Sequence, residues 1–169
     1  NAAIEVSKTH TVALDTFKSL EFGPIGLVDE KTVLYYRDAS YESIQMKPTI
    51  LNKRVEVLKL MSGSDPDILN YYIDKVDGLV IEGFGRGNVS KSFVNGIIKL
   101  IDKGIVVIIT SRCPMGRVRD TYAYEGGGYH LKQLGVLSGG SLPSEKVRLK
   151  LMFVLSSGLD PKSYFTYEY

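Results

Sequence analysis

Residues 104–110 read GIVVIIT, an apolar run without a charged residue between its glycine and its threonine. The five residues between these ends are all isoleucine or valine, the β-branched types that favour strands. A continuous apolar run, as opposed to an alternating one, is typical of a strand that is buried on both faces, as in a parallel sheet. We therefore predict a buried strand here, near the centre of the fold.

Strands and helices are predicted to alternate on both sides of this run. Strands are predicted at residues 55–61, 78–83, 104–110 and 135–138, and helices at residues 64–76, 90–103, 130–135 and 142–155, with Ser64 as the cap of the first helix. Such alternation argues for parallel strands joined by right-handed crossovers. The predicted fold class is α/β: a small parallel four-stranded sheet flanked by helices, flavodoxin- or Rossmann-like, preceded by a β hairpin.

The first part of the chain has a different pattern, rich in threonine, glycine and β-branched residues. Residues 11–14 and 31–36 are predicted as strands, with a turn-rich connection at residues 22–26. We predict a terminal β hairpin at 1–37, a linker at 38–53 and the α/β domain at 54–169. An isolated hairpin is only marginally stable in water, so the first segment is expected to need a partner.

Composition excludes several classes of protein. The 169 residues carry a formal net charge of +2, with the charges interspersed, so we expect neither a nucleic-acid partner nor a membrane partner. One cysteine and two distant histidines exclude an internal disulfide and argue against a zinc site. The first residues lack a basic region followed by an apolar core, so no signal peptide is visible. The chain also lacks an initiating methionine, which is typical of a processed chain or a fragment.

The glycine-rich sequence GFGRGN at residues 83–88 follows a predicted strand and precedes a predicted helix. Functional loops of parallel sheets gather at the carboxyl ends of the strands, and the free N–H groups of a helix start attract anions. One interpretation is thus an anion or carboxylate site with Asn88 as a polar contact. The other is a tight turn in which Asn88 caps the next helix. The spacing matches neither a dinucleotide fingerprint nor a phosphate-binding loop.

A second loop, residues 111–127, follows the buried strand and contains Cys113, Tyr122 and Glu125. Cys113 has no identifiable histidine partner, which favours a buried or half-buried structural cysteine over a nucleophile. Glu125 precedes three glycines, and a mobile loop of this type could carry a substrate ligand. The hydroxyl, base and acid groups at residues 8–16 suggest an active site, but threonine is a common strand residue, so a structural role is favoured there.

Taken together, the motifs resemble those of the bacterial L-asparaginases over nearly the whole chain. The matching segments, in family order, are KTHTVALDTFKS at 8–19, FGPIG at 22–26, EGFGRGN at 82–88, GIVVIITSRCPMGRV at 104–118, YAYEGGG at 122–128 and GVLSGGSLPSEKVRLKLMFVL at 135–155. The resemblance implies the C-terminal domain of such an enzyme, together with the last hairpin of its larger N-terminal domain.

The resemblance also implies a function. The family hydrolyses L-asparagine to L-aspartate and ammonia through an acyl-enzyme on a threonine, without metal or cofactor. That threonine belongs to the N-terminal domain, so no catalytic residue is expected in this chain, which should be inactive alone. Asn88 is the expected first substrate-binding residue, and Glu125 is expected to supply the second contact, with Tyr122 as a competing candidate for it. Both contacts would act across a subunit interface. A homo-oligomer, a dimer or a homotetramer, is therefore expected.

Two alternatives to an L-asparaginase remain open. The same fold serves a subunit of a tRNA-dependent amidotransferase, and it could also be a non-catalytic flavodoxin-like binding module. A cytoplasmic location is favoured over a secreted one, because no signal peptide is visible.

Overall fold

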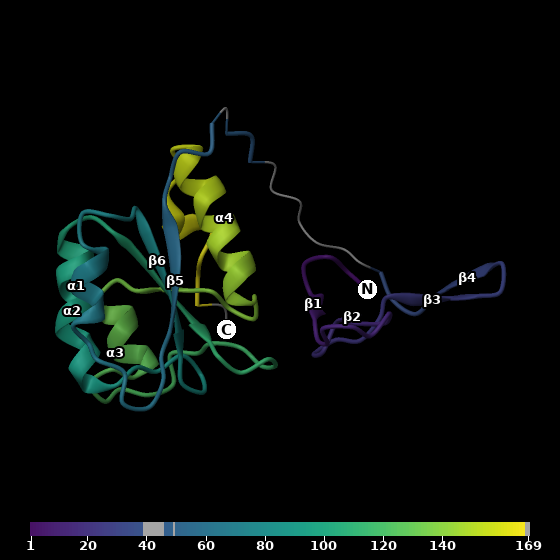
Figure 1. Ribbon diagram of the computed structural model, residues 1–169, viewed down its shortest axis with the longest axis horizontal. Helices are drawn as coiled ribbons and strands as arrows, with labels where there is room; N and C mark the ends of the chain where they lie inside the picture. Colours follow the sequence, from purple (N-terminus) through teal and green to yellow (C-terminus); the bar gives the residue numbers. More distant parts are fainter. Residues whose placement is uncertain (39–45, 49, 168–169) are drawn as a thin grey trace. The chain divides into compact units, whose positions relative to one another are not determined.

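A computed structural model describes residues 1–38, 46–48 and 50–167 of the chain. The chain divides into two compact units, Asn1–Gln45 and Met46–Tyr169 (Figure 1). Of the predicted linker, residues 39–45 and 49 lie outside the described residues, so the predicted domain limits stay a prediction. Across the described ranges, no helix has both the length and the apolar character needed to cross a membrane.

Residues 1–38, the described part of the first unit, contain two antiparallel hairpins, where one was predicted. β1 (Ser7–Lys8) pairs with β2 (Phe17–Lys18), and β3 (Gly26–Asp29) pairs with β4 (Thr32–Tyr35). The strand predicted at 31–36 is confirmed by β4. The strand predicted at 11–14 is wrong, because these residues form the bend and turn between β1 and β2. Their β propensity has no effect there, since propensity stabilises a strand only beside a pairing partner.

The second unit is built on a four-stranded sheet in which all strands are parallel. Its strands are β5 (Val55–Lys59), β6 (Gly78–Gly83), β7 (Val106–Ser111) and β8 (Leu137–Ser138), which lie side by side in this order. The predicted α/β fold class, with a small parallel four-stranded sheet, is confirmed. β6 and β7 occupy the centre of the sheet, as their continuous apolar sequences predict.

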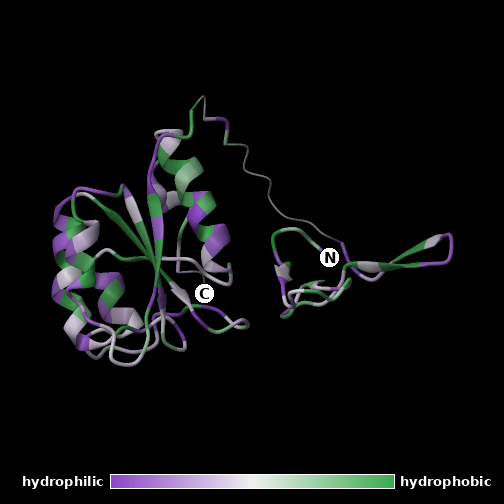
Figure 2. Ribbon diagram, in the orientation of Figure 1, coloured by the Kyte–Doolittle hydropathy of each residue, from purple (hydrophilic) through white to green (hydrophobic). Residues whose placement is uncertain are grey.

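Helices cover both faces of this sheet and make three layers (Figure 1). One face carries α1 (Ile68–Tyr72), α2 (Lys91–Asp102) and α3 (Gly128–Gln133), and the other carries α4 (Ser144–Ser156) with the short 3₁₀ helix η1 (Pro161–Ser163). Successive side chains of a strand point to opposite faces. Ile81 accordingly packs in the same cluster as Phe93 of α2, whereas its neighbour Val80 packs with Leu151 of α4. Figure 2 shows the central strands mostly in the colour of hydrophobic residues.

The first helix is shorter than predicted. α1 ends at Tyr72, because the next residue, Ile73, has an extended ψ of 131° and Asp74 then adopts a positive φ of 61°. These two residues turn the chain out of the helix. Ser64 does not cap this helix; its hydroxyl accepts a hydrogen bond from the N–H of Met61, at 2.8 Å, and so closes the preceding turn. The second predicted helix is confirmed, with Ser90 at its N-cap position.

Candidate functional site

The loops that follow β6 and β7 lie together at the carboxyl edge of the sheet. The parallel register pairs the last residue of β6, Gly83, with the last residue of β7, Ser111. Both loops therefore leave the sheet at the same level. This is the position at which parallel α/β folds assemble their ligand sites.

The glycine loop is a closed turn held by its own backbone. The N–H of Phe84 donates to the carbonyl of Asn88 at 2.8 Å, and the N–H of Asn88 donates back to Phe84 at 2.9 Å. Gly85 and Gly87 have positive φ angles of 49° and 94°, a conformation that residues with a Cβ rarely adopt. A Cβ on Gly87 would also lie 2.8 Å from a methyl carbon of Val118. Two of the loop's glycines are thus required by the turn itself.

Asn88 does not cap the helix that follows it, so this part of the turn interpretation is wrong. Instead its side-chain Oδ1 accepts a hydrogen bond from the N–H of Gly128, at 3.1 Å. Gly128 is the first residue of α3, where N–H groups have no partner within the helix. The Asn88 amide also donates a long hydrogen bond, 3.4 Å, to the carbonyl of Phe84. Asn88 therefore links the glycine loop to the start of another helix.

Side chains at the end of β7 connect three neighbouring loops. The hydroxyl of Ser111 donates to the carbonyl of Gly85 and accepts from the N–H of Cys113 at 3.0 Å. The guanidinium of Arg112 donates to the carbonyl of Leu60, at 3.1 Å, and its central carbon lies 4.5 Å from the centre of the Phe84 ring. Ser111 and Arg112 therefore hold these loops together through contacts within the fold.

Three successive glycines allow the second loop to pack against the first. A Cβ on Gly126 would lie 2.4 Å from the carbonyl oxygen of Val89, and one on Gly127 would lie 2.3 Å from that of Tyr122. The close approach permits a hydrogen bond of 2.9 Å from the N–H of Val89 to the carbonyl of Gly126. Figure 1 places both loops at the same end of the sheet. The segment is therefore tightly packed at its glycines.

Glu125 and Tyr122 lie in this same loop, and both side chains are exposed. The Glu125 carboxylate forms an ion pair of 2.8 Å with Lys91, the first residue of α2. This hydrogen bond raises the pKa of Lys91 above its ordinary value. The ring of Tyr122 lies 5.7 Å from that of Tyr124, centre to centre. The structure thus brings Glu125 and Asn88 to adjoining segments, while their role as substrate ligands stays a prediction.

Cys113 and His130 have separate hydrogen-bond partners, Ser111 and Gly126, and no contact joins them into a nucleophile–base pair. Cys113 is exposed, so the expectation of a buried structural cysteine is wrong. The Nδ1 atom of His130 accepts the N–H of Gly126 at 3.2 Å, which makes it a satisfied structural histidine. In the described part of the chain, no three His, Cys, Asp or Glu side chains are grouped so as to hold a metal ion.

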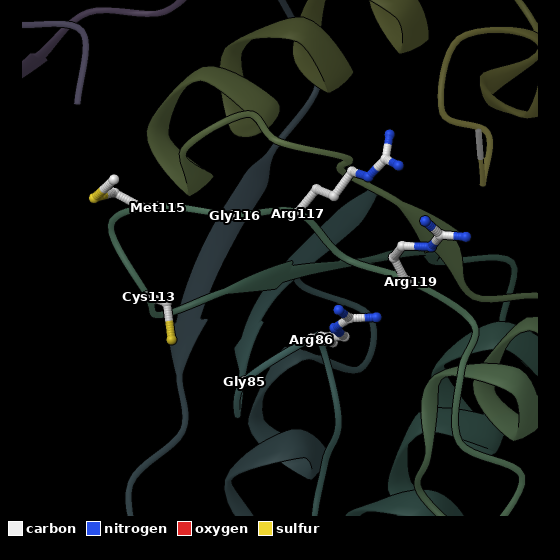
Figure 3. A pocket seen from close by; sticks show the side chains of 7 residues that line it. All are labelled: Gly85, Arg86, Cys113, Met115, Gly116, Arg117 and Arg119. Atoms are coloured by element: carbon white, nitrogen blue, oxygen red, sulfur yellow. The ribbon is translucent and has the colours of Figure 1, made fainter. Parts of the chain in front are cut away.

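An open pocket of about 450 Å³ lies beside these loops, and three of its seven lining residues are arginines. Its lining residues are Gly85, Arg86, Cys113, Met115, Gly116, Arg117 and Arg119 (Figure 3). These arginines were not expected to form a site, because they come from two loops that are separated in the sequence. The only local signal is the sequence Arg117-Val118-Arg119, in which the valine is buried and two arginines flank it.

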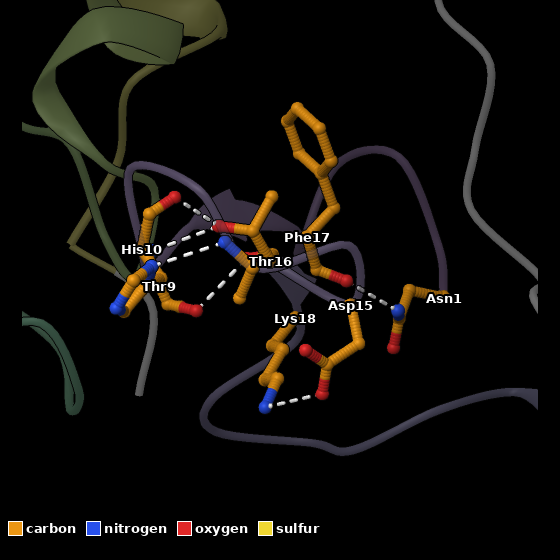
Figure 4. Close-up of polar contacts among 8 residues, drawn as sticks. Asn1, Thr9, His10, Asp15, Thr16, Phe17 and Lys18 are labelled. Carbon is orange, nitrogen blue, oxygen red and sulfur yellow. Dashed lines mark hydrogen bonds and ion pairs between the residues drawn. The ribbon is translucent and has the colours of Figure 1, made fainter.

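The polar residues of the first hairpin serve structure, as expected. The hydroxyl of Thr16 accepts from the N–H of His10 at 2.7 Å and donates to the carbonyl of the same residue (Figure 4). Nδ1 of His10 accepts backbone N–H groups of Val12 and Ala13, both at 3.1 Å. The Thr16 hydroxyl and the His10 imidazole are therefore both engaged in closing the turn between β1 and β2.

Comparison with known proteins identifies relatives of the second unit and of much of the first. The family model of the glutaminase/asparaginase C-terminal domain matches residues 54–166. The D subunit of glutamyl-tRNA(Gln) amidotransferase from Methanopyrus kandleri is 34% identical over 168 residues, covering 94% of this chain and 36% of the relative. The corresponding D subunit from Methanosarcina mazei is 37% identical over 157 residues, covering 89% of this chain and 36% of the relative.

An L-asparaginase of Bacillus licheniformis is also similar, with 30% identity over 153 residues that cover 90% of this chain and 47% of that enzyme. The chain therefore spans between about a third and a half of the length of these curated relatives.

Proposed function

The chain belongs to the glutaminase/asparaginase C-terminal domain family, and we propose that it is the C-terminal part of the D subunit of a glutamyl-tRNA(Gln) amidotransferase. The observation that carries this proposal is the similarity to amidotransferase D subunits along 89% to 94% of the chain, at 34% to 37% identity. The comparisons favour this alternative over the L-asparaginase expected first. The narrower assignment to bacterial L-asparaginases is replaced by membership of the wider family.

In the proposed reaction, water hydrolyses the side-chain amide of a donor amino acid, L-asparagine in the first instance, to a carboxylate and ammonia. A partner subunit would activate the glutamyl side-chain carboxylate on the tRNA with a nucleoside triphosphate, as an acyl phosphate. The ammonia then attacks that carbonyl, phosphate leaves, and a glutaminyl amide forms. The threonine nucleophile implied by the resemblance would lie outside this chain. The present chain would contribute contacts to the donor and to neighbouring subunits.

Glu125 is the residue best placed to bind the donor's ammonium group in this proposal. Its carboxylate is 43% exposed and the paired Lys91 side chain is itself 78% exposed, so a ligand could approach without disrupting the core. A carboxylate pairs strongly with an ammonium group. Asn88 would contribute its remaining amide hydrogen, because its oxygen already accepts the N–H of Gly128. Tyr122 would lie at the rim, and the site would be completed by a second copy of the chain.

The test uses the full-length gene product together with its partner subunits. Ammonia release from L-asparagine is measured in the presence of a nucleoside triphosphate, with and without glutamyl-charged tRNA. Conversion of glutamyl-tRNA to glutaminyl-tRNA is followed in parallel. We expect charged tRNA to stimulate ammonia release and glutaminyl-tRNA to form. Ammonia release at the same rate with and without charged tRNA, and without glutaminyl-tRNA formation, would overturn the amidotransferase proposal. It would support an L-asparaginase, the second candidate, which the similarity to the Bacillus licheniformis enzyme favours. Absence of any amide hydrolysis would overturn both.

Two matched variants test the binding role of Glu125 in the same full-length protein. Glu125→Gln removes the charge that would pair with the donor's ammonium group, so KM for L-asparagine should rise by about tenfold or more, with a smaller change in kcat. Asp102→Asn, at the end of α2 and exposed, is the control and should leave KM unchanged. An unchanged KM in Glu125→Gln would contradict the proposed role.

A further inference from the structure

The pocket beside the glycine loop presents three guanidinium groups without a lining acid. Arg86 comes from the glycine loop, whereas Arg117 and Arg119 come from the segment after β7. Figure 3 shows the three guanidinium groups on one side of the pocket, with Cys113 and Met115 on the other. None of the seven lining residues is acidic. The pocket is therefore a local concentration of positive charge in a chain whose net charge is only +2.

The backbone fixes these arginines close together. The N–H of Arg119 donates to the carbonyl of Arg86, at 3.1 Å, which joins the two loops beneath the pocket. Between Arg117 and Arg119, Val118 is 3% exposed and its N–H donates to the carbonyl of Gly140 at 3.0 Å. Because the valine points into the core, the arginines on either side of it are directed outward.

Acidic side chains do not neutralise the three arginines within the described part of the chain. The guanidinium of Arg86 donates a long hydrogen bond of 3.4 Å to the hydroxyl of Thr121, which carries no charge. The ion pairs found among the described residues involve none of the three arginines. Like charges that line one pocket repel one another, so an anion in the pocket would relieve an unfavourable arrangement. Arg86 and Arg117 are exposed and Arg119 is half-buried, which leaves all of them accessible.

We propose that Arg86, Arg117 and Arg119 bind phosphate groups of an RNA backbone. A phosphodiester offers two free oxygens that match the fork of a guanidinium group, and successive phosphates can engage arginines from two loops. Such contacts position an RNA without reading its sequence. The inference deepens the proposed function and rests on it, since the RNA would be the tRNA. It also departs from the expectation of no nucleic-acid partner, which rested only on the spread of charge along the sequence.

The test measures tRNA binding by fluorescence anisotropy at several salt concentrations, with the full-length protein and its partner subunits. The triple variant Arg86→Gln, Arg117→Gln and Arg119→Gln is expected to bind tRNA about tenfold or more weakly. The slope of log affinity against log salt should fall by about 2 to 3, because each lost phosphate contact removes roughly one unit. The control variant Lys31→Gln, Lys99→Gln and Lys103→Gln removes three exposed charges that do not line the pocket and should change neither quantity.

The single variant Arg117→Gln keeps the proposal falsifiable if the triple variant does not fold. Its side chain is exposed, and the salt slope should fall by about 1. Inorganic phosphate is the second probe, because a free anion and an RNA share the same chemistry. Weakening of tRNA binding by the pocket variants supports the proposal. Phosphate binding in the pocket with unchanged tRNA affinity and slope would overturn it in favour of a small anion.

This binding measurement is separate from the test of the proposed function. Glutaminyl-tRNA formation reports on the amidotransferase, whereas anisotropy reports on RNA contact whether or not the reaction proceeds. If the protein forms glutaminyl-tRNA but the triple variant binds tRNA as tightly as the wild type, only the RNA contact proposed for the pocket is overturned. A chain that binds tRNA through them but forms no glutaminyl-tRNA would overturn only the proposed function.

Discussion

Replacement of Asn88 by alanine should destabilise the second unit by removing a cap that is supplied from a distant loop. The Asn88 oxygen accepts the N–H of Gly128, and α3 has no side-chain cap from its own N-cap residue, Gly127. Gly128 is buried. In Asn88→Ala this N–H would lose its partner in a place that water reaches poorly.

The magnitude follows from the cost of a buried, unpaired backbone donor. That cost is about 1 to 3 kcal/mol, and loss of an N-cap side chain typically costs about 1 kcal/mol. We therefore expect Asn88→Ala to lower the free energy of unfolding by about 1 to 2 kcal/mol. For a chain of this size, at about 2 to 4 °C per kcal/mol, this corresponds to a fall in Tm of about 2 to 8 °C. The long hydrogen bond to Phe84, at 3.4 Å, should add little.

Thermal and urea unfolding of the full chain, followed by circular dichroism, measures this loss, and amide hydrogen exchange at Gly128 localises it. Asn88→Asp keeps an acceptor and places a negative charge at a helix start, so it should lose less than about 1 kcal/mol. Asn95→Ala, on the exposed face of α2, is the matched control and should lose nothing, since alanine is the better helix former. Equal stability of Asn88→Ala and Asn95→Ala, with unchanged protection of the Gly128 amide, would refute the reasoning.

Three further predictions concern stability. Gly126→Ala should lower the free energy of unfolding in urea by more than about 1 kcal/mol, because a Cβ would lie 2.4 Å from the Val89 carbonyl oxygen at a φ of 91°. The control Gly116→Ala, with a φ of 89° and open space around the Cβ, should lower it less. Equal losses for the two variants would contradict the clash at Gly126. Leu151→Ala should lower the free energy of unfolding by about 2 to 5 kcal/mol, because this side chain is fully buried against the sheet; a smaller loss would argue against the α4 packing. Burial alone would raise the pKa of Asp77, but hydrogen bonds from a backbone N–H and a lysine lower this pKa below its ordinary value of 3.8. The carboxylate therefore stabilises the fold fully above pH 3.8, and this stabilisation declines as the pH falls further. The difference in Tm between the wild type and Asp77→Asn should shrink in acid, and a difference that widens in acid would contradict this sign.

The main elements of the second unit could be predicted because their signals are local. The run at 104–110 and the shorter one at 78–83 correspond to β7 (Val106–Ser111) and β6 (Gly78–Gly83). Apolar side chains at these positions need two covered faces whatever the details of the loops. The predicted helix at 90–103 likewise agrees with α2, since a helical apolar stripe is visible within one segment.

The errors arose where the outcome depended on partners elsewhere in the chain. Residues 11–14 have strand propensity but no pairing partner in the described hairpins, so they form a turn. The helix predicted from Ser64 to Val76 begins only at Ile68, and it ends at Tyr72 because Ile73 and Asp74 form a turn. Propensity describes what one segment favours alone, and these segments were decided by their surroundings.

The sequence by itself thus determined the alternation of buried strands and amphipathic helices, and with it a parallel sheet whose loops gather at one edge. Only the tertiary structure decided which contacts the side chains of those loops make. The oxygen of Asn88 accepts a hydrogen bond from an N–H forty residues away, and Arg86 lines the same pocket as Arg117 and Arg119 of another loop. The physical reason is that strand burial is set by local residue type, whereas side chains of loops are placed by glycine φ angles and by hydrogen bonds between distant segments.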